Sequence, residues 1–413
     1  MNRPPDAPAG VGRPRRILMI APTSFFADYG CHVRILEQAR GLAGRGHDIT
    51  LCTYHSGRDI AGLRILRTPA VPGWRRAEVG SSWHKIALDA LLFFLTLQTA
   101  RRLRPDLLHA YLHEGALIGA IVGQLLSIPL VFDFQGSLTG EMIDHRFLRA
   151  GSLAHAPLRR LERWIDHRPA LILANSEHSA RLLTQQFGVP ERRIRLVPDC
   201  IEPQRFCRRE DAAAQEERRR LRAGLGLAAD APLIVYLGLL APYQGIDLLL
   251  QALAQPALRP DAHLLVMGFP HVEHYRQMAA ALGLAGRVAF TGAIAYEDAP
   301  HMLALGDVAV APKISATEGS GKLLSYMAMG LPTVAFDTEV SREYLGDAGR
   351  LAPAGDAAAL AQALRELLDD PAERAAMSRR LRQRAVERFD CRLVLDAIEA
   401  AHTAACGDAD GVL

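Results

Sequence analysis

The chain has 413 residues, of which 49% are hydrophobic and 23% are charged, and its formal net charge is +3. This length exceeds one typical hydrophobic core, so we expect two or three domains. The small net charge gives no indication of a nucleic-acid-binding protein. The six cysteines are scattered and form no C-x-x-C pair, which predicts neither a zinc site nor a disulfide framework and favours a reducing, cytoplasmic compartment.

The amino-terminal part of the chain predicts the opening of a doubly wound sheet. Residues 1–14 are rich in Pro and Gly without an apolar core, which indicates a disordered leader rather than a signal peptide. A continuous apolar run over residues 15–22, a helix ending at Gly44 or Gly46 and a second apolar run follow in the order strand, helix, strand. Ligands of such sheets lie at the carboxyl ends of the strands, so we expect Asp28 and Gly30 on the ligand side.

Residues 81–106 form a predicted helix that is strongly apolar on one side and basic towards its ends. The basic residues are Lys85, Arg101, Arg102 and Arg104. One interpretation is a core helix with a solvated basic end, and the other is a surface helix that contacts anionic lipid. No stretch of the sequence reaches 18 uncharged apolar residues, so no membrane span is predicted.

Two further predicted strands, over residues 106–115 and 129–134, end in polar residues. His113 and Glu114 close the first strand, and Gln135 and Ser137 follow the second. If His109 and His113 both lie on a strand they are two pleats apart, so we expect no joint metal site. We interpret the polar residues here, together with Asp133, Glu141 and Asp144, as an acidic and polar face on the ligand side of the predicted sheet.

A charged, alanine-rich segment over residues 202–231 separates two halves with the same alternation of strands and helices. We interpret it as a linker helix rather than a nucleic-acid-binding element, because acidic residues interrupt the arginines and aromatic residues are missing. The predicted organisation is therefore an α/β protein with an amino-terminal Rossmann-like domain over 15–201 and a second over 232–385. A helix and tail over 386–413 close the chain.

The segment Ala311–Asp337 carries the clearest candidate site. A strand end passes through the small residues Gly319, Ser320 and Gly321 into a helix that stops at Gly330. A glycine-rich loop that enters a helix exposes unpaired N–H groups and the positive end of the helix dipole, which together bind anions such as phosphate. Lys322 adds a positive charge. The alternative interpretation is an ordinary turn with a solvated lysine.

Several motifs in order along the chain resemble one enzyme family. They include GCHVRILEQARGLAGRGHDITLCT, HAYLHEG, IRLVPDCIEPQRF, VYLGLLAPYQGIDLLLQAL and GKLLSYMAMGLPTVAFD. Over residues 15 to 390 the chain resembles the retaining glycosyltransferases of family 4 type (glycosyl transferases group 1), which have the GT-B fold. The resemblance implies two Rossmann-like domains facing across a cleft, a nucleotide-diphospho-sugar donor in the second domain and an acceptor in the first. It implies no cofactor and no metal.

The resemblance also assigns roles to residues of this sequence. It implies catalytic roles for Glu318, Lys322 and Gln135. The implied donor-binding residues are Gly30, Gln244, Gly245, Gly319, Ser320, Gly321, Leu323 and Ser325. The acceptor-side residues are Asp28, His113, Glu114 and Ser137.

Four positions depart from the family pattern. Ser325 replaces a second glutamate, Leu239 and Gln244 stand for a phosphate-binding Arg and Lys, and Gln135 replaces a histidine. The expected function is retaining hexosyl transfer to a glycan or lipid-linked acceptor in polysaccharide biosynthesis, in the cytoplasm or peripherally on the inner membrane face. The departures lead to one alternative, a non-catalytic sugar-nucleotide-binding subunit of a glycan-assembly complex. A second alternative on the same fold is a sugar-nucleotide epimerase, for which Glu318 is the one candidate acid/base carboxylate.

Overall fold

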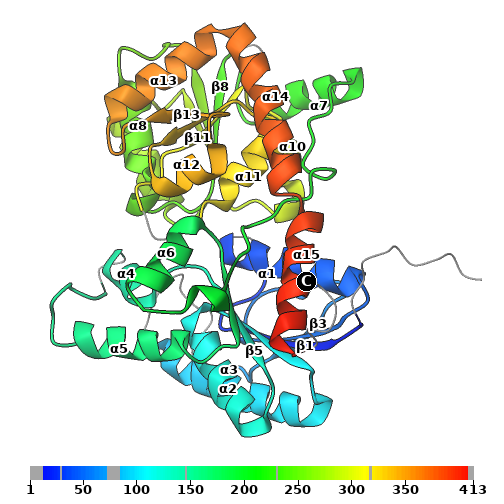
Figure 1. The fold of residues 1–413 in the computed structure, drawn as a ribbon. Helices are drawn as coiled ribbons and strands as arrows, with labels where there is room; N and C mark the ends of the chain where they lie inside the picture. Colours follow the sequence, from blue (N-terminus) through cyan, green and yellow to red (C-terminus); the bar gives the residue numbers. More distant parts are fainter. Residues whose placement is uncertain are drawn as a thin grey trace, which may run out of the picture. The chain divides into compact units, whose positions relative to one another are not determined.

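The computed structural model describes residues 13–27, 30–71, 84–144, 147–228, 231–315 and 319–407 (Figure 1). The chain divides into two compact units. The first unit contains the residues up to 27, residues 34–198 and the residues from 392 onward. The second contains residues 28–33 and 199–391.

The first unit is built on a seven-stranded parallel sheet in the order β3-β2-β1-β4-β5-β6-β7. The strands are β1 (Arg16–Ala21), β2 (Asp48–Thr53), β3 (Arg64–Arg67), β4 (Leu107–Tyr111), β5 (Leu130–Phe134), β6 (Leu171–Ala174) and β7 (Ile194–Leu196). All five residues of β4 and of β5 are buried, as expected for parallel strands covered on both faces. The strand order reverses between β1 and β4, which makes this pair the switch point of the sheet.

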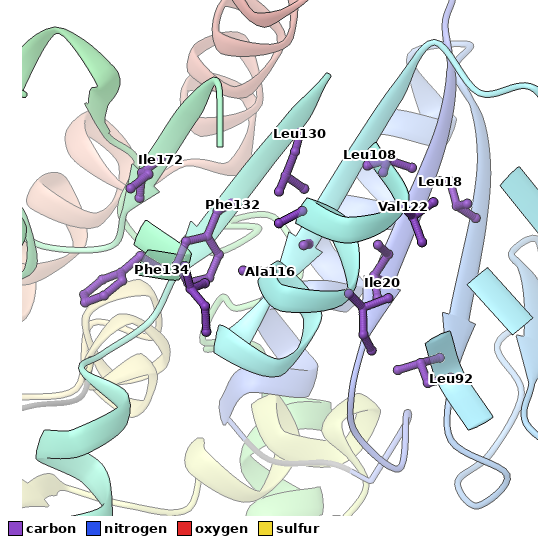
Figure 2. Packing of buried hydrophobic residues seen from close by; sticks show 14 of the residues in the cluster. Leu18, Ile20, Leu92, Leu108, Ala116, Val122, Leu130, Phe132, Phe134 and Ile172 are labelled. Atoms are coloured by element: carbon purple, nitrogen blue, oxygen red, sulfur yellow. The ribbon is translucent and has the colours of Figure 1, made fainter. Parts of the chain in front are cut away.

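Helices cover both faces of this sheet. They are α1 (Gly30–Gly44), α2 (His84–Leu103), α3 (Leu112–Leu126), α4 (Leu138–Asp144), α5 (His155–Asp166), α6 (Glu177–Gln185) and α15 (Cys391–Ala405), with a 3-10 turn η1 (Glu191–Arg193). Figure 2 shows Leu18 and Ile20 of β1 and Phe132 of β5 pointing to the face that α3 covers. Leu92 of α2 packs into the same cluster. Because side chains alternate along a strand, the intervening residues face the opposite side.

That opposite side carries a buried polar network around Asp133. Arg34 of α1 places its Nε 2.8 and 3.0 Å from the two oxygens of Asp133, and Gln38 donates to the same carboxylate at 2.9 Å. Burial alone would raise the pKa of Asp133, but the Arg34 guanidinium outweighs it and the pKa is lowered. Asp133 is fully buried and paired, so the expectation that it contributes to an acidic open face is wrong.

The last helix, α15, packs on the first unit although it follows the second unit in sequence. Its Glu399 lies 2.5 Å from Arg45 and 2.9 Å from His47, and its His402 hydrogen-bonds His109 at 3.1 Å. A Cβ on Gly41 would lie 2.3 Å from a methyl carbon of Leu395, so α1 and α15 are in close contact. The sequence suggests only a terminal helix and tail, whereas the structure makes α15 part of the first unit.

The second unit has a six-stranded parallel sheet in the order β10-β9-β8-β11-β12-β13, with its switch point between β8 and β11. The strands are β8 (Leu233–Leu237), β9 (His263–Met267), β10 (Val288–Gly292), β11 (Val308–Ala311), β12 (Thr333–Phe336) and β13 (Arg350–Ala352). The helices are α7 (Ala212–Gly224), α8 (Ile246–Ala254), α9 (Val272–Ala281), α10 (Ala299–Leu303), α11 (Gly321–Ala328), α12 (Glu339–Leu345), α13 (Ala357–Asp369) and α14 (Pro371–Arg388), with 3-10 turns η2 (Pro242–Gln244) and η3 (Tyr296–Asp298). The α/β architecture with two parallel sheets confirms the predicted fold class.

Helix α7 is the helix expected in the linker segment. Asp211 caps its amino terminus by accepting a hydrogen bond from the N–H of Ala214. Arg222 is buried and donates to the carbonyl of Leu305 at 2.5 Å and to Asp307 at 3.1 Å. One arginine of this charged helix therefore anchors it within the second unit.

A disulfide joins Cys200 and Cys391, which are 191 residues apart and stand at the two ends of the long segment of the second unit. Beside it, Ile201 and Asp390 form an isolated parallel bridge. The prediction that the cysteines form no disulfide is wrong, because tertiary contact rather than sequence spacing brings this pair together. The cysteine pattern therefore gives no argument for a reducing compartment.

The basic, apolar helix expected near residues 81–106 is confirmed as α2. Leu88 and Leu92 are buried against the sheet, whereas Phe94 is 65% exposed and Arg101 is exposed. Among the residues that the structure describes, none of the helices combines the length and apolarity needed to cross a membrane.

Candidate functional site

The candidate site in the second unit lies where strands β8 and β11 end. These neighbouring parallel strands form the switch point of the sheet, so their carboxyl ends open onto the crevice that binds ligands in doubly wound folds. Gly238 follows β8, and Pro312 and Lys313 follow β11. The chain then enters α11, so one edge of the sheet gathers two strand ends and a helix amino terminus.

The predicted helix after the glycine loop is confirmed as α11, which begins at Gly321. Ser320 occupies the N-cap position, but its side chain makes no capping bond. Ser320 is 5% exposed, and its Oγ has no hydrogen-bond partner in the described part of the chain. The first N–H groups of a helix have no intrahelical acceptor. This helix end therefore offers backbone donors and a hydroxyl to an anion, with the positive end of the helix dipole behind them.

Lys322 is held in a defined position in the first turn of α11. Its Nζ donates to Oε1 of Gln244 at 2.8 Å and to the hydroxyl of Tyr236 at 3.2 Å, and it lies 4.3 Å from the centre of the Tyr236 ring. Gln244 is 7% exposed. A Cβ on Gly238, whose φ is +149°, would lie 2.7 Å from the Lys322 Nζ. The ammonium therefore rests against a position that only glycine leaves open.

A second lysine, Lys313, was not identified from the sequence. It is 6% exposed, and its Nζ donates to the carbonyl of Gly319 at 2.9 Å. This bond ties the end of β11 to the loop that precedes α11. A lysine directly after the buried run Val308–Ala311 and Pro312 was the available signal, since residues after a parallel strand lie at the ligand edge.

Gly245 brings the turn η2 against the end of β11. Its φ is +72°, and a Cβ would lie 1.8 Å from the carbonyl oxygen of Pro312. The close approach places Gln244, which immediately precedes it, beside Lys322. Gly245 thus has a structural reason to be glycine at this site.

The other predicted donor residues on α11 lie on its buried side. Leu323 is fully buried, its N–H donates to the carbonyl of Ser320 at 2.9 Å, and Ser325 is 6% exposed. Tyr326 accepts a hydrogen bond from the N–H of Leu237 at 2.8 Å, which fixes α11 to the end of β8. Leu323 and Tyr326 therefore position the helix amino terminus.

Of three further predicted residues, the structure describes only Gly30. Glu318 and Asp28 lie outside the described residues. Gly30 is the first residue of α1 and is exposed, and no atom of the described residues outside its own helix backbone lies within 4 Å of where its Cβ would be. Close packing therefore does not require glycine at position 30.

In the first unit, Gln135 follows β5 and is half-buried. Its carbonyl accepts from Nδ2 of Asn175 at 3.3 Å, and its own Nε2 is buried without a hydrogen-bond partner among the described residues. The position at the carboxyl end of a central strand agrees with the ligand-side location expected for it.

His113 lies in the first turn of α3, so the prediction that its strand continues to Gly115 is wrong. Its Nε2 is 3.3 Å from Asp166 and 3.7 Å from Glu162. Ser137 donates to Glu162 at 2.7 Å. Burial acts to lower the pKa of His113, but the Asp166 and Glu162 carboxylates outweigh it and raise the pKa to about 9. His113 and Ser137 thus belong to one buried cluster with the two acids of α5.

Glu114 belongs to a different group, on the side of α2. Its carboxylate is 25% exposed and 4.0 Å from Lys85. Nearby, Tyr54 donates to Asp89 at 2.6 Å. Burial, with the charge of Glu114, raises the pKa of Asp89 to about 7. The two consecutive residues His113 and Glu114 therefore lie in separate clusters.

Both units of the chain match domains of known glycosyltransferases. Residues 29–200 match the glycosyl transferase 4-like domain, and residues 217–384 match the glycosyl transferases group 1 family. A 2-deoxystreptamine glucosyltransferase from Streptomyces kanamyceticus is 28% identical over 363 residues, covering 82% of this chain and 90% of the relative. A D-inositol 3-phosphate glycosyltransferase from Acidothermus cellulolyticus is 29% identical over 399 residues, covering 89% and 85%.

Solved structures share the fold. Sucrose-phosphate synthase from Thermosynechococcus elongatus has a TM-score of 0.79 at 20% identity, covering 96% of this chain and all of that one. HepE from Anabaena in complex with UDP-glucose has a TM-score of 0.76 at 20% identity, covering 94% of this chain and 100% of that chain. With the two family matches, these results confirm the resemblance: the chain belongs to the glycosyltransferases of the GT-B fold, with a 4-like amino-terminal domain and a group 1 carboxy-terminal domain.

Proposed function

We propose that this glycosyltransferase moves a hexose from a nucleotide-diphospho-sugar to a hydroxyl of a glycan or lipid-linked acceptor, with retention of the anomeric configuration. The observation that carries the proposal is the position of Lys322. Its ammonium lies in the first turn of α11, at the switch point of the second sheet, where the side chains of Gln244 and Tyr236 hold it.

The donor's two phosphates match the chemistry of this helix end. As the glycosidic bond breaks, negative charge develops on the leaving diphosphate, and preorganised donors stabilise it most when they need no rearrangement. The backbone N–H groups at Gly321 and Lys322, the Oγ of Ser320 and the Lys322 ammonium supply such donors. Gln244 acts as a positioning residue for Lys322, which accounts for a hydrogen-bonding side chain at a position where the family carries a cation.

Retention needs no protein nucleophile in this proposal. The acceptor oxygen attacks C1 of the sugar on the face that the diphosphate leaves, and the C1–O bond electrons pass to the phosphate oxygen. That oxygen then takes the proton of the acceptor hydroxyl. The protein's part is to hold the diphosphate and stabilise its charge, in contrast to the paired carboxylates of glycoside hydrolases. Glu318 and Gln135 remain our candidates for contacts to the sugar and the acceptor.

The relatives support a hexose donor without fixing the nucleotide. HepE is described in complex with UDP-glucose, and a GDP-mannose-dependent mannosyltransferase from Mycolicibacterium smegmatis is 32% identical over 237 residues, 54% of this chain. We therefore treat UDP- and GDP-hexoses as the candidate donors. The acceptor class rests on the first domain, where Gln135 and Glu114 are the proposed polar contacts.

Peripheral membrane contact is part of the proposal when the acceptor is lipid-linked. Phe94, which is 65% exposed, and Arg101 are seven residues apart on α2 and so share its outer face. An apolar ring and an exposed guanidinium on one face suit an anionic lipid surface. Flotation with anionic vesicles tests whether α2 contacts the membrane. Equal flotation after Lys85, Arg101, Arg102 and Arg104 are changed to Ser would rule out a role for this basic helix in membrane contact.

The central experiment is a melting screen followed by a transfer assay. A ligand that binds the native state raises the melting temperature, so UDP-, GDP- and ADP-hexoses are compared first. The best donor is then assayed for hydrolysis and for transfer to glycan acceptors, and the anomeric configuration of the product is read by NMR. Retained configuration with release of nucleoside diphosphate supports the proposal. Binding without turnover would instead select a non-catalytic sugar-nucleotide-binding protein.

A further inference from the structure

Helix α5 buries two acids while two of its large apolar residues remain partly exposed. Its buried residues are Glu162, Ile165 and Asp166, whereas Leu161 and Trp164 are 39% and 38% exposed. Glu162 and Asp166 are four residues apart and share one face of the helix. Carboxylates are almost never fully buried without a cation beside them. The inward face of α5 therefore needs a positively charged partner.

Among the described residues, the cationic side chain beside these two acids is His113, but its distances to them are longer than those of a charged hydrogen bond. A charged N–H···O bond is about 2.7–2.9 Å long. The Nε2 of His113 lies 3.3 Å from Asp166 and 3.7 Å from Glu162. Two ligand atoms of a tetrahedral ion with bonds of about 2.1 Å are about 3.4 Å apart. The two distances from His113 to the carboxylates are close to this value, as expected if the three side chains share one ion.

The hydrogen bonds of the three side chains also support a shared ion. Glu162 accepts from Ser137 at 2.7 Å and from the hydroxyl of Thr139 at 2.5 Å, so its orientation is fixed. Asp166 is 0% exposed, yet both of its oxygens are without a hydrogen-bond partner in the part of the chain that the structure describes. The Nε2 of His113 has no hydrogen-bond partner there either. The atoms that lack partners are those with metal-ligand chemistry.

The charges of the three side chains also favour a bound cation. The rings of Phe132 and Phe134 lie 5.2 and 5.4 Å from the His113 ring, so the surroundings are apolar. With His113 protonated, the three side chains carry a net charge of about −1 in this environment, which is costly. With a neutral imidazole, a divalent cation balances the two carboxylates.

We propose that His113, Glu162 and Asp166 bind one divalent transition-metal ion, with Zn²⁺ as the best match. Their ligand atoms all lie within 4.8 Å of one another. An imidazole with carboxylates suits Zn²⁺ or Mn²⁺, whereas Ca²⁺ and Mg²⁺ prefer oxygen ligands alone. Ser137 and Thr139 orient Glu162, as outer partners of a metal ligand do. The ion links the start of α3 to α5 in the first unit and is independent of the proposed donor site.

The test is metal binding by the full-length, tag-free protein after removal of bound metal with a chelator. The metal content is measured after equilibration with Zn²⁺, Mn²⁺ or Mg²⁺ and gel filtration, and melting temperatures are recorded with each ion. The expected result is one Zn²⁺ per chain and a rise in melting temperature of about 5–10 °C at a hundredfold excess over Kd, with no response to Mg²⁺. Wild-type protein that holds no stoichiometric Zn²⁺ or Mn²⁺ overturns the proposal.

Variants locate the ion. Asp166→Asn keeps the shape of the side chain but removes its charge, and we expect the Kd for Zn²⁺ to rise by at least about 100-fold. Glu399→Gln is the matched control, because it disrupts another buried His–acid pair, with His47 at 2.9 Å, and should leave Zn²⁺ binding unchanged. Should Asp166→Asn fail to fold, Glu162→Gln makes the same test, since its amide oxygen still accepts from Ser137. Unaltered Zn²⁺ binding in the folded variant would place the ion elsewhere and reject this site.

Discussion

Replacing Lys322 by Met tests the role assigned to the start of α11. Met keeps an unbranched apolar stem against the Tyr236 ring, where the Lys322 Nζ lies 4.3 Å from the ring centre, but removes the ammonium. If that charge stabilises the leaving diphosphate, its loss resembles the loss of one preorganised oxyanion donor. Such losses lower kcat by about 10²–10³-fold, or about 2.7–4 kcal/mol of transition-state stabilisation.

The same substitution has a folding cost that must be separated from the catalytic one. Gln244 is 7% exposed and loses the donor that lies 2.8 Å from its Oε1. Leaving a buried acceptor unpaired costs about 1–3 kcal/mol, so the melting temperature falls modestly while the protein stays folded. The assay is steady-state kinetics of donor hydrolysis and sugar transfer, with the best donor from the melting screen, at a temperature well below the melting temperature of the variant.

Two comparisons make the result specific. Lys85→Met removes a lysine on α2 in the first unit and should leave kcat/KM for the donor unchanged. Gly238→Ala leaves Lys322 in place but puts a Cβ 2.7 Å from its Nζ, so it should displace the ammonium and lower kcat/KM. If Lys322→Met retained kcat/KM within about threefold of the wild type, the ammonium would have no part in stabilising the diphosphate, and the reasoning would be refuted.

Three further predictions follow from particular contacts. Gln244→Leu removes the side-chain oxygen that accepts a hydrogen bond from the Lys322 ammonium at 2.8 Å. We expect kcat to fall about tenfold with little change in the melting temperature. Wild-type kinetics in this variant would show that Gln244 does not position Lys322. Burial raises the pKa of Asp89 in the folded protein to about 7, so ionisation of Asp89 destabilises the native state as the pH rises from about 4 to 7. In urea unfolding, we expect Asp89→Asn to be more stable than the wild type by on the order of 2–4 kcal/mol at pH 8 and equally stable at pH 4. A gain in stability at both pH values would contradict this cause. Cys200→Ser opens a disulfide that spans 191 residues and should cost about 2–5 kcal/mol, so a reductant should lower the melting temperature of the wild type but not of the variant.

Much of the fold could be predicted because its strands are continuous apolar runs. Val308–Ala311 and Thr333–Phe336 read as buried parallel strands, and the glycine-containing loop between them predicted a helix beginning near Lys322. Local sequence is sufficient here, since turn residues and apolar runs determine the element boundaries. The same local pattern identified Lys322 as a candidate site residue, whereas Gln244 was identified through the family resemblance.

What could not be predicted depends on contacts between distant segments. Cys200 meets Cys391, and α15 returns to the first unit through Glu399, because of packing that no short motif encodes. His113 was placed on a strand because Tyr111, Leu112 and His113 continue an apolar run, whereas the helix starts at Leu112, which has φ +57°. Its partners Glu162 and Asp166 lie about fifty residues further along the chain.

Binding of nucleotides that differ in phosphate number tests the central claim most directly. Isothermal titration of the wild type and of Lys322→Met with the preferred nucleoside diphosphate, and with the corresponding nucleoside, separates contacts to the phosphates from contacts to the base and ribose. We predict that Lys322→Met weakens binding of the diphosphate at least tenfold and leaves binding of the nucleoside unchanged. Equal affinities of wild type and variant for the diphosphate would contradict the assignment of the α11 amino terminus as the diphosphate site.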